Sequence, residues 1–555
     1  MTQAHPAAAG GVGGPPLSSR QLWLAAIVLA AANFVVVLDM SIANVCVPGI
    51  AGQLGTATSQ ATWVITSYCV AEAISVPLTG WLAIRFGAVR VFSVAMGLFG
   101  IASLLCGLAP TLGFLIAARI LQGCAAGPLM PLSQTLLLRI FPPRMAPAAL
   151  GLWAMTTLIA PVLGPIAGGW ICDQYSWPVI FLINIPLAVG CALVAWTLLR
   201  RYELAQRRSP VDKVGLVLLV VWVGALQLML DKGRSLDWFA SPTIIALAVV
   251  AVLGLAAFLI WELHEAHPIV ELRVFRHRGF TMSVLSISLA FGAFFAMNVL
   301  TPLWLQGFMG YTATQSGWVV FWSGVFALLV APLAVWLSGK RDPRWLVSTG
   351  VLWLGGVTFW RAMASTDMAY WDIALPLMLT GLALPFFFIA ASGLALASVQ
   401  RHEMESAAGM MNFLRTLSGA AAVSIMHTAW ENRIIHAHAE LVGLTDRGGQ
   451  MLRQLEQEGL SAQAALHALA QLLQGQSVML ATNQQMFVIA SCFAVTAGVI
   501  WLAPRPGRAL GPVATRQAQF TPAGGAGQQP YQGPPPGPTQ PGSASSACQS
   551  RASAT

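Results

Sequence analysis

The chain has 555 residues, of which only 9% are Asp, Glu, Lys or Arg, and its mean hydropathy is +0.71. Soluble domains carry roughly 25% charged residues, so this sequence cannot cover a water-exposed surface and must belong to an integral membrane protein. Its net charge of +9 does not indicate nucleic-acid binding, because Lys and Arg lie in short loops rather than in a basic patch with interleaved aromatic residues. We expect a lipid bilayer around the chain and no nucleic-acid partner.

Long apolar runs follow one another along the chain. A membrane-spanning helix needs about 20 residues, and fourteen runs approach or exceed that length. They lie near residues 22–46, 62–84, 91–109, 112–138, 147–172, 178–199, 214–231, 242–262, 281–305, 317–338, 345–363, 371–398, 406–429 and 478–503. The sequence therefore predicts an all-α integral membrane protein.

The distribution of basic residues predicts the orientation. When the loops between these runs are assigned alternately to two sides, most of the 29 Lys and Arg residues fall on the side of the N-terminus. Cytoplasmic loops carry such an excess. Residues 1–19 are small and rich in Pro and Gly, and the first run is too long for a cleavable signal peptide. We expect a multi-pass protein of the bacterial inner (plasma) membrane with both termini in the cytoplasm.

Four ionisable residues lie deep inside apolar runs: Asp39, Glu72, Arg119 and Arg415. A charge at the centre of a bilayer costs about 2.5–3.5 kcal/mol on insertion scales. Such residues persist where they line a cavity, pair with one another, or move a proton or an ion. The four charges therefore indicate a protein that transports something across the membrane.

Asp39 and Arg119 lie at similar depth in the bilayer. The helical rise places Asp39 about 26 Å from the N-terminal side and Arg119 about 10 Å from the other side. The two side chains are expected to pair and to offset part of each other's desolvation cost. Two interpretations remain open: a pair that takes part in coupling, or a structural pair that fixes helix register.

Glu72 lies near mid-membrane on a polar stripe that includes Tyr68, Ser75 and Thr79 at helical spacing. This pattern indicates a wall of a water-accessible cavity, where a carboxylate could load and release a proton. The alternative is a carboxylate that pairs structurally and never titrates. Asn412 and Arg415 form a second polar pair, which either contacts substrate or packs between helices.

Two stretches of sequence closely resemble the 14-helix drug–proton antiporters of the major facilitator superfamily. They are LDMSIANVCVP at 38–48 and TWVITSYCVAEAISVPLTGWLAIRFGAVR at 62–90. The nearest likeness is to the inner-membrane subunit of Emr-type tripartite multidrug efflux pumps, and it extends over about residues 20–505.

Further motifs of that family recur along the chain. The matching positions are Gly80, Arg85, Gly87 and Arg90 in the loop between helices 2 and 3, Arg119, Gln122 and Gly123 in helix 4, and Pro161, Gly164, Pro165, Gly168 and Gly169 in helix 5. The sequence departs from the family at Ile84, where an acidic residue is usual, so a charge lock in that loop is in doubt.

The resemblance implies a major facilitator fold with 14 transmembrane helices arranged 6 + 2 + 6. The expected parts are a cytoplasmic tail (1–21), an N-terminal six-helix bundle (22–200), two inserted helices with linkers (201–280), a C-terminal six-helix bundle (281–505) with a periplasmic loop (430–476), and a disordered cytoplasmic tail (506–555). The segment SAQAALHALAQLLQ within that loop has the spacing of an amphipathic helix.

The resemblance also implies proton-coupled multidrug efflux by alternating access, with no cofactor beyond a proton gradient and no metal. It suggests proton coupling by Asp39, Glu72 and Arg119, and gating by the motif residues of helices 2 and 5 named above. The residues expected to bind substrate are Tyr68, Glu72, Gln122, Asn298, Asn412 and Arg415. The expected partners are amphipathic drugs, protons, a periplasmic adaptor and an outer-membrane channel.

Other functions remain alternatives at this stage. One is export of an endogenous amphiphile such as a fatty acid on the same fold. Another is an intramembrane lipid-modifying enzyme, but the sequence contains no evident nucleophile–base pair and no Walker A motif. The eight cysteines have no disulfide or metal spacing and are expected to be small apolar packing residues.

Overall fold

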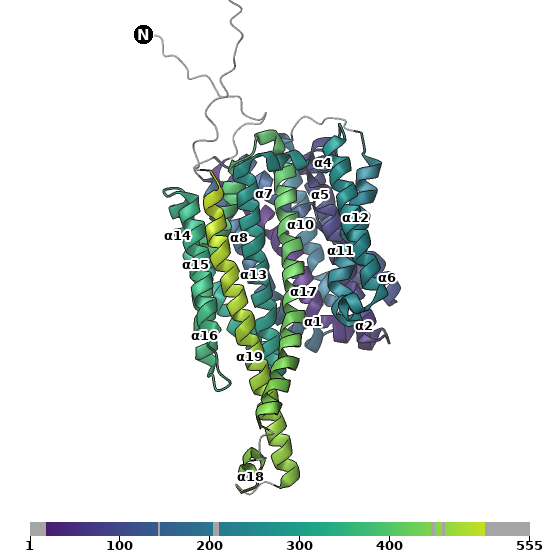
Figure 1. The fold of residues 1–555 in the computed structure, drawn as a ribbon. Coiled ribbons are helices and arrows are strands. Elements are labelled where there is room, and N and C mark those ends of the chain that lie inside the picture. The colour runs from purple at the N-terminus through teal and green to yellow at the C-terminus, as the bar shows by residue number, and fades with distance from the viewer. Residues whose placement is uncertain (1–17, 143–144, 204–209, 446–449, 458–460, 505–555) are drawn as a thin grey trace, which may run out of the picture. The chain divides into compact units, whose positions relative to one another are not determined.

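The computed structural model describes residues 18–142, 145–203, 210–445, 450–457 and 461–504, apart from a few side chains within them. Every regular element in these ranges is a helix (Figure 1). We call the end of the helix bundle at which α1 begins the N-side, and the other end the opposite side. The predicted tail at 506–555 lies outside the described residues.

The helices of the first part of the chain match the first six predicted spans. They are α1 (Ser19–Gln53), α2 (Thr58–Ala61), α3 (Trp63–Ser75), α4 (Thr79–Phe86), α5 (Ala88–Gly107), α6 (Leu112–Ala126), α7 (Leu129–Ile140), α8 (Ala146–Gln174), α9 (Val179–Leu182) and α10 (Asn184–Leu199).

The remaining helices correspond to the inserted pair and the second group of six. They are α11 (Lys213–Lys232), α12 (Pro242–His264), α13 (Arg278–Phe308), α14 (Ala313–Ser338), α15 (Pro343–Arg361), α16 (Tyr370–Ala397), α17 (Met404–Thr445), α18 (Gln450–Gln457) and α19 (Ala462–Val499), with short 3₁₀ turns between some of them.

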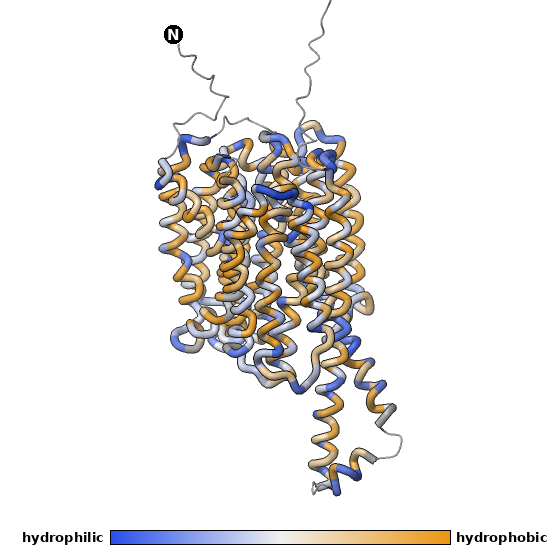
Figure 2. The backbone as a smooth tube through the Cα atoms, turned by 90° about the vertical axis from the view of Figure 1, so that its left-hand side faces the viewer, coloured by the Kyte–Doolittle hydropathy of each residue, from blue (hydrophilic) through white to orange (hydrophobic). Residues whose placement is uncertain are grey.

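Helix length and composition support a protein that crosses the membrane many times. Ten spans among the described residues are long and apolar enough to cross a membrane, and two bent helix pairs raise that number to twelve. The other two predicted spans correspond to α15 and α17, which are helical but carry more polar residues. The helices are thus consistent with fourteen spans, and Figure 2 shows the apolar residues that dominate them.

Two of the predicted spans are bent in the structure. The second consists of α3 and α4, which meet at 58° across a break of Val76–Leu78. Pro77 lies in this break, and a proline removes a backbone donor and disturbs the helix around it. The fifth span bends by 45° within α8, in the Gly- and Pro-rich segment between Pro161 and Ile166. The bend in α8 lies within the predicted helix-5 motif, and the break between α3 and α4 lies just before Gly80, the first predicted gating residue of helix 2.

The predicted loop 430–476 is largely helical. α17 has 42 residues and α19 has 38, which corresponds to about 60 Å each, or twice the thickness of a hydrocarbon core. The two helices pack against each other and extend past the other helices as a hairpin that includes α18 (Figure 1). The predicted amphipathic segment is therefore the first part of α19 rather than a separate surface helix.

Contacts between the first and second groups of six helices run along two seams. α8 packs against α14 and α16, and α17 packs against α4 and α7. The inserted helices α11 and α12 pack together, and α11 also contacts α3 and α17. The interface that alternating access would have to open is therefore formed by α4, α7, α8, α14, α16 and α17.

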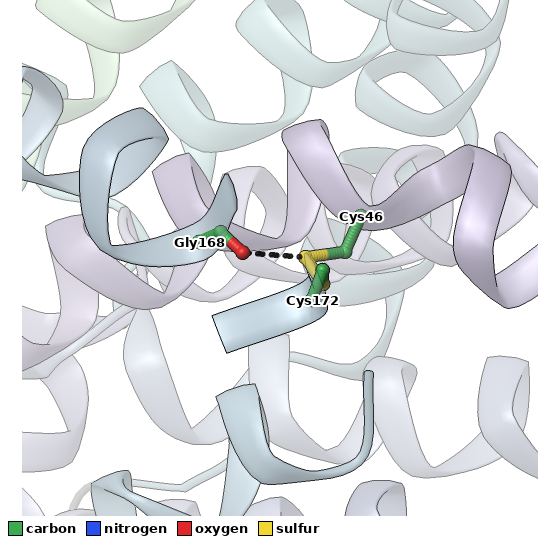
Figure 3. The surroundings of a disulfide bond; sticks show 3 residues. All are labelled: Cys46, Gly168 and Cys172. Atoms are coloured by element: carbon green, nitrogen blue, oxygen red, sulfur yellow. Dashed lines mark hydrogen bonds between the residues drawn. A yellow bond between two sulfur atoms is a disulfide. The ribbon is translucent and has the colours of Figure 1, made fainter. Parts of the chain in front are cut away.

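A disulfide between Cys46 and Cys172 corrects the expectation that the cysteines are only packing residues. The bond joins α1 to α8 toward the opposite side (Figure 3). The Cys46 sulfur also lies 3.5 Å from the carbonyl oxygen of Gly168. The two cysteines are 126 residues apart, and only the packing of α1 on α8 brings them together. The bond thus links α1 covalently to α8.

We predict that the thiols of Cys46 and Cys172 resist alkylation until a reductant is added to the denatured protein. The matched control is Cys124, an exposed free cysteine on α6, which should be alkylated without reduction. Mass spectrometry of maleimide-treated peptides measures all three sites. Labelling of Cys46 and Cys172 before reduction, to the same extent as Cys124, would contradict the disulfide.

Candidate functional site

A buried ion pair joins α1 to α6. The Arg119 guanidinium lies 2.6 Å from the carboxylate of Asp39, and both side chains are almost completely buried. A second nitrogen of Arg119, Nε, donates to the backbone carbonyl of Val64 at 3.1 Å. The depth match read from the sequence is therefore confirmed as a direct contact, which also holds α3 through its backbone.

Polar side chains from two more helices complete this cluster. Asn184 on α10 donates to Asp39 Oδ1 at 2.7 Å, and Gln122 donates to the same oxygen at 3.1 Å. The hydroxyl of Ser103 on α5 accepts from both amides at 3.2 Å and donates to the Phe181 carbonyl. Asp39 thus accepts hydrogen bonds from one guanidinium and two amides, so both of its carboxylate oxygens have donors inside an apolar bundle.

The Arg119 guanidinium also stacks on an aromatic ring. It lies 4.1 Å from the centroid of the Tyr68 ring, a distance at which cations bind aromatic faces. Its remaining nitrogen, Nη2, has no hydrogen-bond partner among the described residues, and neither has the Tyr68 hydroxyl. The cluster therefore has unused donors on the side of α3, next to Glu72.

Small residues bring α3 and α6 into close contact. A Cβ atom added to Gly123 would lie 3.1 Å from the backbone nitrogen of Glu72. One added to Gly127 would lie 3.0 Å from the backbone carbonyl oxygen of Glu72. Glycines four residues apart allow such close backbone approach in membranes. The motif glycine of helix 4 thus fixes the position of Glu72 relative to the ion pair.

Glu72 differs from Asp39 in its surroundings. Its side chain is buried, with 9% exposed, and no described residue donates a hydrogen bond to its carboxylate. Its charge interacts with those of Arg119 on its own side and Arg415 from the second group of helices. Glu72 therefore interacts electrostatically with Arg119, Asp39 and Arg415, and it forms no ion pair with either arginine among the described residues.

Asn412 and Arg415 are placed by α17 against α7 of the first group. The Asn412 amide donates to the Gln134 side chain at 3.2 Å, and Arg415 lies 2.6 Å from the Met130 sulfur. Arg415 also faces the Trp153 and Phe291 rings, at 5.7 and 5.1 Å. The Nε of Arg415 and one polar atom each of Asn412 and Gln134 have no partner among the described residues.

At the N-side, two contacts hold the groups together. Arg139 at the end of α7 forms an ion pair with Glu405 at the start of α17. Gly80 on α4 packs against Ser406, which a Cβ atom at Gly80 would overlap. Gly80, a predicted gating residue, is therefore located where the two groups meet.

Glu203 supplies a carboxylate to the loop in which Ile84 departs from the family pattern. It accepts hydrogen bonds from the backbone nitrogens of Val89 and Arg90, at 3.2 and 2.9 Å, at the start of α5. Gly87 has a φ of +93°, and a side chain there would also collide with Glu203. Arg85, another motif residue, has its guanidinium over the Trp81 ring, 5.4 Å from the ring centroid.

The glycines of the helix-5 motif face α1. Cβ atoms at Gly164 and Gly168 would come within 3.2 Å of the Ile42 backbone, whereas Gly169 has open space around its Cα. Pro161 lies at the edge of the bend in α8, and Pro165 lies within it. The motif thus allows α8 to pack closely on α1.

The structure divides the predicted substrate residues into separate places. Gln122 and Tyr68 both contact Arg119 in the Asp39 cluster. Asn412 and Arg415 lie on α17 against α7, and Glu72 interacts electrostatically with Arg119 and Arg415. Asn298 on α13 donates to the carbonyl of Phe294 in its own helix. Sequence reasoning missed Asn184, Ser103 and Glu203. Asn184 follows an apolar run, and its position in a span was the one signal that could have indicated it.

The described residues contain no group of three His, Cys, Asp or Glu side chains that could hold a metal ion. The arrangement instead concentrates buried charges and unused polar atoms between helices. Such a site can exchange protons and bind a polar or charged group, but it offers no activated nucleophile.

Comparison with known proteins identifies the family. The family model described as Major Facilitator Superfamily matches residues 29–423. The chain belongs to the Major Facilitator Superfamily. Membership makes it a multi-pass membrane protein and a secondary transporter rather than an enzyme, as the sequence predicted.

Relatives within the Major Facilitator Superfamily match nearly the full described chain. The multidrug export protein EmrB of Haemophilus influenzae is 43% identical over 497 residues, which cover 89% of this chain and 98% of that protein. EmrB of Escherichia coli strain K12 is 41% identical, with 88% and 97% coverage. The fatty acid resistance protein FarB of Neisseria gonorrhoeae is also 41% identical, with 89% and 98% coverage.

A solved structure of the superfamily shares the fold. The proton:xylose symporter XylE aligns with a TM-score of 0.55 at 12% identity, covering 88% of this chain and 97% of the symporter. At that identity the likeness concerns the fold alone. The predicted major facilitator architecture is therefore confirmed.

We predict that Asp39→Asn lowers stability because it leaves the Arg119 cation buried without its counter-ion. Breaking a buried pair in this way costs about 3–5 kcal/mol. The double variant Asp39→Asn/Arg119→Gln removes both charges and should recover most of the loss. Thermal unfolding of purified protein in detergent measures the three forms. An Asp39→Asn variant that melts with the wild type would contradict the role of the pair.

Proposed function

We propose that the chain exports amphipathic drugs in exchange for protons, by alternating access of the site between its two groups of six helices. The observation that carries this proposal is the buried Glu72 carboxylate, which interacts electrostatically with arginines of both groups and has no hydrogen-bond donor among the described residues. The relatives of this chain support the substrate class, because the two EmrB proteins are multidrug export proteins. The proton gradient is the driving force, and no cofactor is required.

Glu72 is the proposed proton carrier, and Asp39 with Arg119 is the fixed element beside it. Asp39 accepts three hydrogen bonds, one from a guanidinium, so its charge is satisfied in place. Glu72 has no such donors and can exist neutral at little cost when Arg415 moves away. Opening the site to one compartment and then to the other would change the distance between Glu72 and Arg415, and this change would drive proton loading and release.

The proposed substrate site is the region around Tyr68, Glu72, Asn412 and Arg415. The unpartnered Tyr68 hydroxyl, the Arg415 nitrogen and the amide oxygen of Asn412 offer polar contacts. Phe291 and Trp153 beside Arg415 add aromatic surface. Such a combination fits amphipathic compounds with one charged or polar group, and cationic drugs would compete with protons for Glu72.

The proposed orientation places the N-side in the cytoplasm of a bacterium, with the protein in the inner membrane. The positive-inside distribution of Lys and Arg supports this assignment, as does a disulfide toward the opposite side. The Arg139–Glu405 pair and the Gly80–Ser406 contact then close the cytoplasmic end of the site. Rearrangement of these contacts would admit substrate from the cytoplasm or the inner leaflet.

Export of fatty acids is a second candidate, favoured by one observation. FarB, a fatty acid resistance protein, is as similar to this chain as the Escherichia coli EmrB protein. Arg415 would then bind the carboxylate of the substrate directly. Competition by a long-chain fatty acid against a fluorescent cation in transport assays distinguishes the two substrate ranges.

We predict that Glu72→Gln abolishes proton-driven uptake of a fluorescent cationic drug into inverted membrane vesicles. Glutamine fills the same volume but neither binds nor releases a proton. The control is the double variant Glu72→Gln/Gln122→Glu, which returns an acid to the Asp39 cluster rather than to the proposed site and tests whether any nearby carboxylate suffices. Uptake by Glu72→Gln at the wild-type rate and with the same pH profile would refute the proposed carrier.

The hairpin of α17, α18 and α19 is the proposed docking surface for a periplasmic adaptor protein, which would connect the pump to an outer-membrane channel. Apolar side chains on this hairpin are exposed: Ile435, Met451, Leu466 and Leu472 are 45–66% accessible. The hairpin extends past the other helices (Figure 2). Because α17 and α19 are each longer than one hydrocarbon core is thick, we infer that these side chains lie outside the lipid. We propose that a helical segment of the adaptor packs against these apolar side chains and buries them.

We predict that the double variant Leu466→Glu/Leu472→Glu loses co-purification of the adaptor and cellular drug resistance, while proton-driven uptake in inverted vesicles persists. The charges should block burial of the α19 face. The matched control Gln463→Glu/Gln474→Glu adds the same charge at exposed polar positions of the same helix. Normal adaptor binding by the leucine variant would show that the hairpin is not the docking surface.

A further inference from the structure

The segment 230–240 leads from α11 toward α12, the two inserted helices, at the opposite side (Figure 1). It contains the end of α11 and the 3₁₀ turns η2 (Arg234–Leu236) and η3 (Trp238–Ala240), and we call it the strap. α11 packs against α3 of the first group of six helices and against α17 of the second. The strap therefore lies where it can contact both groups.

Two side-chain contacts hold the strap to α17. Arg234 forms an ion pair with Glu431 through two hydrogen bonds, one of which Nε donates at 2.8 Å. Paired bonds between a guanidinium and a carboxylate fix the orientation of both groups. The indole nitrogen of Trp238 donates to the Thr428 hydroxyl at 2.8 Å, about one turn earlier on α17. The strap is thus attached to the second group by an ion pair and by a ring.

The backbone of the strap has an uncommon shape, and α17 supports it. Asp237 and Trp238 have φ values of +54° and +50°, a region that residues other than glycine rarely adopt. The Trp238 nitrogen donates to the Gly233 carbonyl at 2.7 Å. From α17, the Ser424 hydroxyl donates to the Leu230 carbonyl at 2.6 Å. Strained backbone persists where the surrounding structure determines it, so the shape of the strap depends on its attachment to α17.

The contacts of the strap with α3 are weaker. The Thr66 hydroxyl donates to the Asp231 carboxylate at 2.8 Å, and that carboxylate is partly exposed to solvent. The Lys232 ammonium lies 3.4 Å from the Thr62 hydroxyl, at the start of α3, and 4.9 Å from the centroid of the Trp63 ring. Among the described residues, no ion pair joins the strap to α3. The strap is therefore held more firmly by the second group than by the first.

The strap lies between the proposed transport site and the opposite end of the bundle. Thr66 precedes Glu72 by six residues on α3, which is about 9 Å, and Ser424 follows Arg415 by nine residues on α17, which is about 14 Å. The strap thus connects the two helices that carry Glu72 and Arg415. Any movement that changes the distance between these helices at the opposite side has to act on the strap.

We propose that the strap is a releasable bridge between the two groups of helices, which stays attached to α17 and leaves α3 in each transport cycle. The proposal rests on the proposed alternating access, in which the two groups move relative to each other. A segment bonded to both groups cannot follow both, and the α3 contacts break because they include no ion pair. The inserted helices thereby favour the conformation in which the strap contacts α3.

A cross-link between the strap and α3 tests whether these contacts have to break. The test uses the full-length protein in which every cysteine except Cys46 and Cys172 is replaced by alanine, with Thr66→Cys/Asp231→Cys added. Oxidation of the membranes links the two new cysteines, and proton-driven uptake of a fluorescent cation into inverted vesicles is measured before and after. We expect uptake to fall at least tenfold on oxidation. The controls are the two single-cysteine variants, which cannot form the link and should keep their uptake.

Distances between spin labels show which contacts break, and they decide the matter if the cross-linking variant fails to fold. Labels at exposed positions pair Ser235 of the strap with Asn432 on α17, or with Gln60 on α2, directly before α3. Electron paramagnetic resonance of the purified protein is recorded at several pH values, with and without drug. We expect the distance from 235 to 60 to change with these conditions and the distance from 235 to 432 to stay constant.

The outcomes separate this proposal from the proposed function. Undiminished uptake by the cross-linked protein, or a strap that keeps its distance to α2 while its distance to α17 changes, would overturn the releasable bridge and leave proton-driven export intact. Absence of proton-driven uptake by the wild type would instead refute the proposed function itself.

Discussion

The ion pair between Asp39 and Arg119 is the interaction on which the N-terminal half of the molecule depends. Neither charge is tolerable alone in an apolar bundle, and together they still require hydrogen bonds for their remaining oxygens and nitrogens. Those bonds come from Val64 on α3, Gln122 on α6 and Asn184 on α10. Ser103 on α5 accepts from the two amides, so five helices meet at one polar point. A slip of one residue in any of them would leave a charge uncompensated, which makes the cluster a register device as well as a neighbour of the transport site.

Glu72 and Arg415 differ from the Asp39–Arg119 pair because neither of them forms an ion pair with a described residue. Glu72 is held close to the cluster by the glycines of α6, but it receives no donor from it. Arg415 approaches from the other group of helices and contacts Met130 and aromatic rings instead of a carboxylate. The electrostatic balance of Glu72 therefore depends on how the two groups of helices are placed. That dependence is what an exchanger needs, because moving one group changes the affinity of the site for a proton or a cationic drug.

Apolar length and charge position predicted most of the fold. Each of the fourteen predicted runs forms one helix or two consecutive helices. The similar depth of Asp39 and Arg119 predicted their contact, and the structure confirms it. The partners Asn184 and Glu203 were not predicted. The position of Asn184 in a span could have indicated a buried polar contact, but the partner of a lone amide or a loop carboxylate is decided only when distant segments meet. The Cys46–Cys172 bond was missed for the same reason. The segment 430–476 was predicted to be a loop because it is too polar for a membrane span. In the structure it contains the end of α17, α18 and the start of α19.

The central claim is that Glu72 gives up a proton when a cationic drug binds. Purified protein in weakly buffered detergent solution, with a pH-indicator dye, measures this release directly when drug is added. The account predicts release of a proton by the wild type. It predicts none by Glu72→Gln. Release from Glu72→Gln equal to that of the wild type would contradict the account and would assign the exchanged proton to another group.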